Sequence, residues 1–335
     1  MTWKERRTIT ILSSILLILV IALLIVLGVR YRQSRETPAD STEASGDALL
    51  TDDDEYTSLS YYNGSATLSF SLDEEGNWIW ADDPGFPLDD ATVTAITDLL
   101  VSLKPQQTIL EPEPLDTYGL DDPTATLTAT GDTAGDLTLA LGKTTTDGDS
   151  YYMQMNGDES TIYIIADTLY QYMCTPIYDM MRLPELPDLS QEHLRSVSIQ
   201  GYSYDGEKRE STITVLTAQD DNGAVTWRSN GANVTSDETV QALLEDLAHL
   251  AFDRCVDYRP SDDASVLCGS EQPAAQLKVF YTTPSGTDQT LTLTIGQPLL
   301  DGSGRYVWMD DDTTIYYLPT AALDPMMRIS VSGLE

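Results

Sequence analysis

The apolar residues of the chain fall into several patterns, and the first is a single unbroken run. Residues 9–29 carry no charge and are mostly Ile, Leu and Val. A helix of this length spans about 30 Å, the thickness of the hydrocarbon core of a bilayer. Arg30 follows the run directly, where a signal peptide would have a small-residue cleavage site. The pattern therefore predicts a retained transmembrane helix, preceded by a short cytoplasmic tail over residues 1–8.

The segment after this run changes in composition. Residues 30–56 are rich in Asp, Glu, Ser and Thr and have little apolar surface to bury, so they are predicted to form a flexible acidic linker. Three basic residues flank the apolar run on each side, so the charge rule for orientation is tied. Because large domains cross the membrane largely regardless of charge, we expect the remainder outside. The predicted location is the cell membrane, single-pass, with an extracytoplasmic C-terminal domain.

The rest of the chain alternates between period-two and helical patterns. Within residues 57–80, apolar side chains alternate with Thr and Ser, which predicts strands. Residues 89–103 have apolar side chains at helical spacing, and Asp89 can cap this helix. Residues 236–250 repeat the helical pattern, and Thr235 with Glu238 has the spacing of a capping box. The sequence therefore predicts two amphipathic helices among strands.

The same series of elements occurs twice. Trp80 precedes the first helix and Trp227 the second, 147 residues apart, and four apolar positions of each helix share that separation. A separation shared by so many positions indicates a tandem duplication. We expect one repeat over residues 57–183 and the second over residues 184–335.

Short motifs support the duplication. The first repeat contains a Tyr-Gly-Leu-x-x-Pro motif and a Leu-Gly pair, whose residues are Tyr118, Gly119, Leu120, Pro123 and Gly142. The second keeps Gly296 and Tyr306 at matching places but has Leu267-Cys268-Gly269 for the first motif. Gly142 and Gly296 each follow an apolar strand, where a turn with positive φ would favour glycine.

The fold class that follows is α+β. We expect antiparallel sheets with one amphipathic helix per repeat, tandem duplicated, plus one N-terminal transmembrane helix. Short helices are expected near Leu169 and Leu323.

Charge narrows the classes of function. The chain carries a net charge of −36, and from residue 36 onward 12 Lys and Arg face 53 Asp and Glu. Such a surface repels phosphate groups, which excludes a nucleic-acid role. It also argues against docking flat on anionic lipid headgroups. We interpret the acidity as favouring solubility.

The order of motifs resembles a known family. A membrane span followed by repeated units of Trp, amphipathic helix, Tyr-Gly-Leu-x-x-Pro, Leu-Gly and Tyr-Tyr is similar to the bacterial family called domain of unknown function 4340, over about residues 60–330. That family has no established activity. Its members are often anchored proteins encoded beside ABC-type export components of the kind linked to gliding motility. The resemblance therefore implies an accessory role at an envelope transporter.

Residues with catalytic or metal-binding chemistry are sparse. Asp147-Gly148-Asp149 and Asp220-Asp221-Asn222-Gly223 offer oxygen ligands but lack the spaced set of a calcium loop, so turns are expected there. Gly201-Tyr202-Ser203-Tyr204-Asp205 has Asp where a nucleophile elbow needs Gly. The available bases are His193 and His249, and His249 is expected to cap a helix. We predict no catalytic residue, no metal site and no cofactor.

Two interpretations remain open for the cysteines and for a group of aromatic residues. Cys255 and Cys268 could pair outside the cytoplasm or remain thiols. A second set could form a stacking surface for a glycan or a protein, or could belong to the core; its members are Trp78, Trp80, Tyr151 and Tyr152.

The function we expect is a non-catalytic, membrane-anchored extracytoplasmic scaffold or accessory protein. Its anchor is Ile9–Val29, and its partner is a protein of the envelope, with ABC transporter subunits as the candidates. The alternative is a cell-wall glycan-binding module that uses exposed Trp and Tyr.

Overall fold

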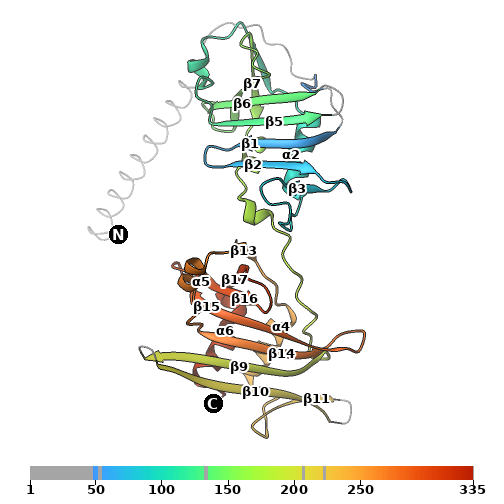
Figure 1. The fold of residues 1–335 in the computed structure, drawn as a ribbon, viewed down its shortest axis with the longest axis vertical. Helices are drawn as coiled ribbons and strands as arrows, with labels where there is room; N and C mark the ends of the chain where they lie inside the picture. The colour runs from blue at the N-terminus through green and yellow to red at the C-terminus, as the bar shows by residue number, and fades with distance from the viewer. Residues whose placement is uncertain (1–47, 52–54, 132–134, 206–207, 222–223, 335) are drawn as a thin grey trace, which may run out of the picture. The chain divides into compact units, whose positions relative to one another are not determined.

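The computed structural model describes residues 48–51, 55–131, 135–205, 208–221 and 224–334 (Figure 1). The expected tail 1–8, the expected membrane span 9–29 and most of the linker 30–56 lie outside these residues. Among the residues that are described, no helix combines the length and the apolar character that a membrane crossing requires. The chain forms two compact units. Unit 1 consists of Met1–Asp82 and Val93–Cys174, and unit 2 of Asp83–Thr92 and Thr175–Glu335.

Unit 1 contains an eight-stranded antiparallel sheet with the order β3-β2-β1-β5-β6-β7-β8-β4. Its strands are β1 Tyr56–Tyr62, β2 Thr67–Leu72, β3 Trp78–Trp80, β4 Gln107–Leu110, β5 Ala125–Gly131, β6 Asp136–Thr144, β7 Ser150–Met155 and β8 Thr161–Ala166. Its helices are α2 Ala91–Val101, the 3-10 helix η1 Leu115–Tyr118 and α3 Thr168–Met173.

Strand alternation determines which face of this sheet is buried. In β5, Ala125, Leu127 and Ala129 are buried, while the Thr residues between them are not fully buried. They pair with three buried Leu residues of β6, which places both sets on one face. Thr is β-branched and suits the outward positions of a strand. The predicted two-sided pattern of this hairpin is confirmed.

Helix α2 matches the expected amphipathic helix. Its residues Val93, Ile96 and Leu100 are fully buried, as the helical spacing predicts. The helix begins at Ala91, two residues later than expected, and the carboxylate of Asp89 accepts a hydrogen bond from the N–H of this first residue at 3.1 Å.

Unit 2 contains a nine-stranded antiparallel sheet with the order β12-β11-β10-β9-β14-β15-β16-β17-β13. Its strands are β9 Leu194–Asp205, β10 Lys208–Asp221, β11 Ala224–Ser229, β12 Ala232–Asn233, β13 Arg254–Asp257, β14 Ala275–Thr282, β15 Asp288–Pro298, β16 Gly304–Met309 and β17 Ile315–Pro319. Its helices are the 3-10 helix η2 Ile177–Met180, α4 Glu238–Ala248, α5 Asp262–Cys268 and α6 Thr320–Ser332.

Helix α4 begins differently from the sequence prediction. Asp237 is the N-cap, and its carboxylate accepts hydrogen bonds from the N–H groups of Thr239 and Val240. The expected capping box of Thr235 with Glu238 is wrong. The hydroxyl oxygen of Thr235 accepts instead from the N–H of Trp227 at 2.8 Å, which occupies it in the sheet.

Helix α6 covers one face of the unit 2 sheet. It contacts β9, β10, β14, β16 and β17, and α4 packs on α6. The hydroxyl of Thr212 in β10 donates to the carbonyl oxygen of Ser330 in α6 at 2.8 Å. A Cβ on Gly201 of β9 would overlap that same carbonyl oxygen, so glycine permits the close approach of helix and strand.

The two sheets have the same strand order. In chain order β1, β2, β3 and β4 correspond to β9, β10, β11 and β13, and β5 to β8 correspond to β14 to β17. One helix lies between the third and fourth of these strands in each unit, α2 in one and α4 in the other. Strand β12 has no counterpart among the described strands of unit 1.

Candidate functional site

The structure separates the four aromatic residues proposed as a stacking surface. Trp78 and Trp80 lie on β3, an edge strand of the unit 1 sheet. Tyr151 and Tyr152 lie on β7, and four strands stand between β3 and β7 in the sheet. The four residues therefore belong to two separate places.

Both tyrosines of β7 pack against other rings. The ring centroid of Tyr151 lies 4.9 Å from that of Tyr170, and the centroid of Tyr152 lies 5.0 Å from that of Tyr118. Both side chains are half-buried, and this burial raises the pKa of each hydroxyl above its ordinary value. These contacts leave only part of each ring for a ligand.

The first motif builds a small apolar cluster at the end of η1. Tyr118 and Leu120 are buried and pack with Ile162 of β8. The hydroxyl oxygen of Tyr118 accepts a hydrogen bond from the N–H of Glu113 at 3.2 Å. Gly119 ends η1 with φ of 70°, a left-handed conformation that favours glycine. The motif therefore shapes a chain reversal, and Pro123 lies in the short segment between this reversal and β5.

Gly142 and Gly296 are not at positive-φ turns, so that expectation is wrong. Both lie inside strands, β6 and β15. A Cβ on Gly142 would overlap the carbonyl oxygen of Tyr118, and a Cβ on Gly296 would overlap that of Cys268. In each unit the end of a short helix rests directly on the backbone of a strand, and glycine is needed for this close approach.

The same geometry explains why the second repeat can depart from the motif. Cys268 ends α5, and Gly269 follows with φ of 102°, as Gly119 follows Tyr118. The contact on Gly296 is made by the backbone carbonyl of Cys268, so the side chain is free to differ. Tyr306 of β16 is half-buried, and this burial raises the pKa of its hydroxyl.

The histidines do not form a catalytic group. Nδ1 of His193 lies 3.1 Å from both the Ser190 hydroxyl oxygen and a carboxylate oxygen of Asp188. A catalytic triad needs the serine and the carboxylate on opposite ring nitrogens, and here both face the same one. His249 is the C-cap of α4, with Nδ1 at 3.0 Å from the carbonyl oxygen of Glu245, in the place expected for it.

The acidic loop at Asp147 forms a hydrogen-bonded turn. Asp147 accepts from the Thr145 hydroxyl at 2.5 Å, a bond that lowers the pKa of its carboxyl group, and the N–H of Gly148 donates to the Thr145 carbonyl oxygen at 2.9 Å. Over the described part of the chain, His, Cys, Asp and Glu form no cluster with the spacing of a metal site. Part of the other acidic loop, residues 222–223, lies outside the described residues.

All three cysteines are free thiols. Cys255 is buried, Cys268 is half-buried and Cys174 is exposed. Burial, followed by the neighbouring carboxylates Asp257, Asp312 and Asp179, raises the pKa of the Cys255 thiol to about 12. A thiol of this kind is a poor nucleophile at neutral pH.

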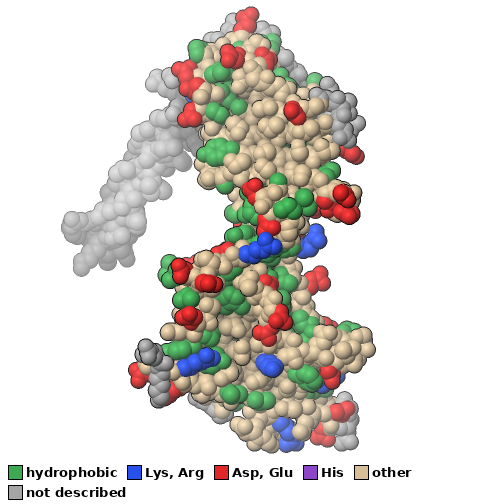
Figure 2. Space-filling view, viewed as in Figure 1, with side chains coloured by type: hydrophobic (Ala, Val, Ile, Leu, Met, Phe, Trp, Pro, Cys, Tyr) green, Lys and Arg blue, Asp and Glu red, His purple; other side chains and the backbone are tan. Residues whose placement is uncertain are grey.

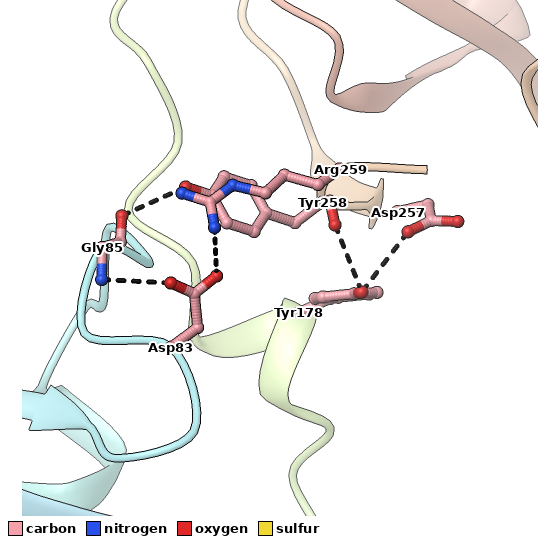
Figure 3. A network of polar contacts seen from close by, with 6 residues as sticks. All are labelled: Asp83, Gly85, Tyr178, Asp257, Tyr258 and Arg259. Carbon is pink, nitrogen blue, oxygen red and sulfur yellow. Dashed lines mark hydrogen bonds and ion pairs between the residues drawn. The ribbon is translucent and has the colours of Figure 1, made fainter. Parts of the chain in front are cut away.

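Segment Asp83–Thr92 belongs to unit 2 although it is distant in sequence from the rest of that unit, and polar contacts hold it there (Figure 3). Nη1 of Arg259 donates to the carboxylate of Asp83 at 2.7 Å, and the hydroxyl of Tyr258 donates to the carbonyl oxygen of Gly85 at 3.1 Å. Arg259 has φ of 61°, and its guanidinium group lies 4.8 Å from the Tyr258 ring centroid. The Arg259 side chain is 59% exposed, so solvent screens this ion pair and its contribution to stability is small.

Ring packing stabilises the segment more than the ion pair does. Phe86 is buried, with its ring edge-on to Tyr258 at 5.1 Å and stacked near Tyr178 at 6.3 Å. The Tyr178 hydroxyl donates to Asp257 at 3.3 Å, and burial raises the pKa of this hydroxyl. The polar contacts of Figure 3 therefore join Asp83 and Gly85 to the residues just after β13, and join Tyr178 of η2 to the end of β13 and to Tyr258.

A surface that the sequence did not predict lies on the other side of the unit 2 sheet. Thr214 and Leu216 of β10 are buried on the face that α6 covers, so the alternate residues Ile213 and Val215 lie on the opposite face. We call this the outer face. Its positions on three neighbouring strands follow from the register: Arg209, Ser211, Ile213, Val215, Thr217 and Gln219 of β10, Ser196, Ser198, Gln200, Tyr202 and Tyr204 of β9, and Gln276, Lys278 and Phe280 of β14.

The outer face combines exposed apolar side chains with cations. Ile213, Val215 and Phe280 are 61%, 43% and 38% exposed. The guanidinium group of Arg209 lies 3.7 Å from the ring centroid of Tyr202, and Lys278 is exposed. Figure 2 shows Lys and Arg side chains among hydrophobic ones over the strands of this unit. The arrangement has no reactive group and suits contact with another surface.

The fold and this surface together define a two-unit α+β protein with an open sheet face. A family model described as Domain of unknown function (DUF4340) matches residues 78–268, which is more than half of the chain. The chain belongs to this family. Comparison with curated proteins and with solved structures finds no match.

Proposed function

We propose that the chain is a membrane-anchored, extracytoplasmic scaffold or accessory protein that binds a protein partner in the envelope and performs no catalysis. The observation that carries the proposal is the outer face of unit 2. One side of its sheet is covered by α6, while the other presents Ile213, Val215 and Phe280 to solvent. Apolar side chains gathered on one exposed face indicate a binding surface. The apolar run 9–29 is the proposed anchor.

The candidates for the partner are subunits of an ABC-type transporter. The test is purification of the tagged full-length chain from membranes of its own cells, with a version lacking residues 9–29 as the control. Transporter subunits should co-purify with the anchored chain and be depleted in the control. If the anchored chain purifies without any membrane protein after mild crosslinking, the scaffold function is refuted.

The proposed orientation has its own test. Protease added to intact protoplasts should digest the acidic C-terminal part, because residues 36–335 are expected outside. Full protection before lysis, with digestion after it, would place that part inside and contradict the proposal.

We further propose that the two units arose by tandem duplication. The support is their shared strand order together with the matched contacts of Gly142 and Gly296 under short helices. Independent origins would have no reason to preserve both an eight-strand order and a glycine contact.

One observation favours glycan binding as the second candidate. Trp78 and Trp80 point to the same side of the edge strand β3, and both are only half-buried. Titration with soluble peptidoglycan fragments, followed by tryptophan fluorescence, tests it. A saturable change that Trp78→Ala removes would support this function, and no change at millimolar fragment would end it.

A further inference from the structure

We infer that the outer face of unit 2 binds a folded protein whose matching surface has an apolar centre bordered by carboxylates. This inference rests on the proposed scaffold function and specifies the chemistry of its partner. The surface in question is formed by β9, β10 and β14, together with Arg228 of the adjoining strand β11.

The register arranges the outer face as a flat grid. Three rows cross from β10 through β9 to β14, and they are Ile213–Gln200–Gln276, Val215–Ser198–Lys278 and Thr217–Ser196–Phe280. Arg228 pairs with Thr217 and extends the third row onto β11. The two exposed aliphatic residues are therefore consecutive on one face of β10, with short polar side chains beside them. This is the layout of an apolar centre with a polar surround.

Charge distinguishes this face from the rest of the molecule. Of the 12 Lys and Arg after residue 36, Arg209, Lys278 and Arg228 belong to this grid or its border. The outward positions from Ser196 to Tyr204, Arg209 to Gln219 and Gln276 to Phe280 contain no Asp or Glu, and the outward carboxylates of Asp221 and Asp288 lie at the ends of β10 and β15. In a chain with 54 acidic residues, a face whose carboxylates are confined to its margin favours an anionic counterpart.

The size of the face suits a protein. The face runs about 34 Å along β10 from Arg209 to Gln219 and about 14 Å across β10, β9 and β14, so its area is on the order of 400 Å². This is about half of the roughly 800 Å² that each partner contributes to a stable protein interface, and it matches a smaller, transient contact. The side chains are mostly Ser, Thr and Gln, which lie flat and provide no pocket for a small ligand.

A lipid surface and a second copy fit less well. Three cations contribute only about 1 kcal/mol each near an anionic bilayer, and the chain as a whole is strongly repelled from one. Two copies placed face to face about a two-fold axis would bring together two surfaces that both carry Arg209, Lys278 and Arg228, so the cations of one copy would meet few carboxylates on the other. A different protein with carboxylates around an apolar centre has neither problem.

The test uses the full-length anchored chain in its own cells, with p-benzoylphenylalanine placed at Val215 as the crosslinking probe. The control carries the same group at Val225 of β11, which is similarly exposed at 41%. Val225 pairs with Asp220 and therefore lies on the opposite face of the sheet from Val215. Crosslinking from position 215 should yield one partner protein, with the crosslinked segment containing Asp or Glu beside apolar residues. The yield should fall at least about tenfold when Lys278→Glu is added, and a carboxylate-to-lysine change in the partner should restore it.

Each alternative result has a distinct meaning. Crosslinks from position 225 and none from 215 would overturn this inference and leave the scaffold function standing. Crosslinks from position 215 to a second copy of the chain would also overturn it. So would co-sedimentation of the chain with phosphatidylglycerol vesicles that Lys278→Glu abolishes. No protein crosslink from either position would refute both the inference and the scaffold function. A thermal melt of each variant shows that the fold is retained.

Discussion

Replacing Gly142 by alanine tests the contact that defines the repeated motif. The added Cβ overlaps the carbonyl oxygen of Tyr118 and lies 3.1 Å from the backbone of Gly119 and from Cγ of Leu120. None of these neighbours is the free end of a flexible side chain. Relief therefore requires the end of η1 to move away from β6.

The expected loss of stability follows from what that movement uncovers. Tyr118 and Leu120 are buried against Ile162, and full burial of such a side chain is worth about 1.5–3 kcal/mol. Losing part of this burial, together with the strain of an overpacked site, should lower the free energy of unfolding by about 2–4 kcal/mol. The matched control is Gly148→Ala, where φ is 84° but no atom lies within 4 Å of the new Cβ. The control should cost about 1 kcal/mol through its backbone conformation alone.

Urea unfolding of the soluble part, followed by circular dichroism, measures both variants. Because the chain has two units, the comparison is between transition midpoints of matched variants rather than between extrapolated free energies. If Gly142→Ala unfolds with the wild-type midpoint, or loses no more than Gly148→Ala, the close contact is not important and the account of the motif fails.

Four other outcomes are expected. Leu100→Ala should cost about 2–5 kcal/mol because the side chain is fully buried, whereas Thr126→Ala on the other face of β5 should change the melting midpoint little. Iodoacetamide at pH 8 should label Cys174 quickly and Cys255 only after unfolding, as mass spectrometry would show. Since the folded state holds the Cys255 proton to about pH 12, the stability from this thiol is full below its ordinary pKa of 9.0 and falls as the pH rises through the folded value. Phe86→Ala should cost about 3–5 kcal/mol and speed proteolytic cleavage within Asp83–Thr92, and unchanged cleavage would show that this ring does not hold the segment.

Local patterns predicted the elements well because each depends on nearby residues. The spacing of Val93, Ile96 and Leu100 fixes the buried side of α2, and strict alternation fixes the two faces of β5. The start of α4 was less predictable because two neighbours, Thr235 and Asp237, could each serve as the cap. In the folded sheet, the Thr235 hydroxyl oxygen accepts a hydrogen bond from the N–H of Trp227, so Asp237 is the residue that caps the helix.

The rest depended on contacts between distant residues. The role of Gly142 could not be inferred from its own surroundings, since the atom that excludes a side chain belongs to Tyr118. The outer face was also missed, because Val215 and Lys278 are about 60 residues apart in sequence and come to lie in one row only through the pairing of β9 with β10 and β14. A signal was present in Ile213, Val215 and Leu216, because strand alternation places the first two on one face and Leu216 on the other.

Unit 2 is built from two separate stretches of the chain, so its first stretch is synthesised well before the residues that pack against it. Phe86 leaves the ribosome 172 residues before its packing partner Tyr258. At typical translation rates of about 5–20 residues per second, that interval lasts about 10–30 s. For this period Phe86, buried in the finished protein, lacks the edge-on contact with the Tyr258 ring. A nascent chain that stalls between these points therefore presents an apolar segment to chaperones, and the completed protein hides it.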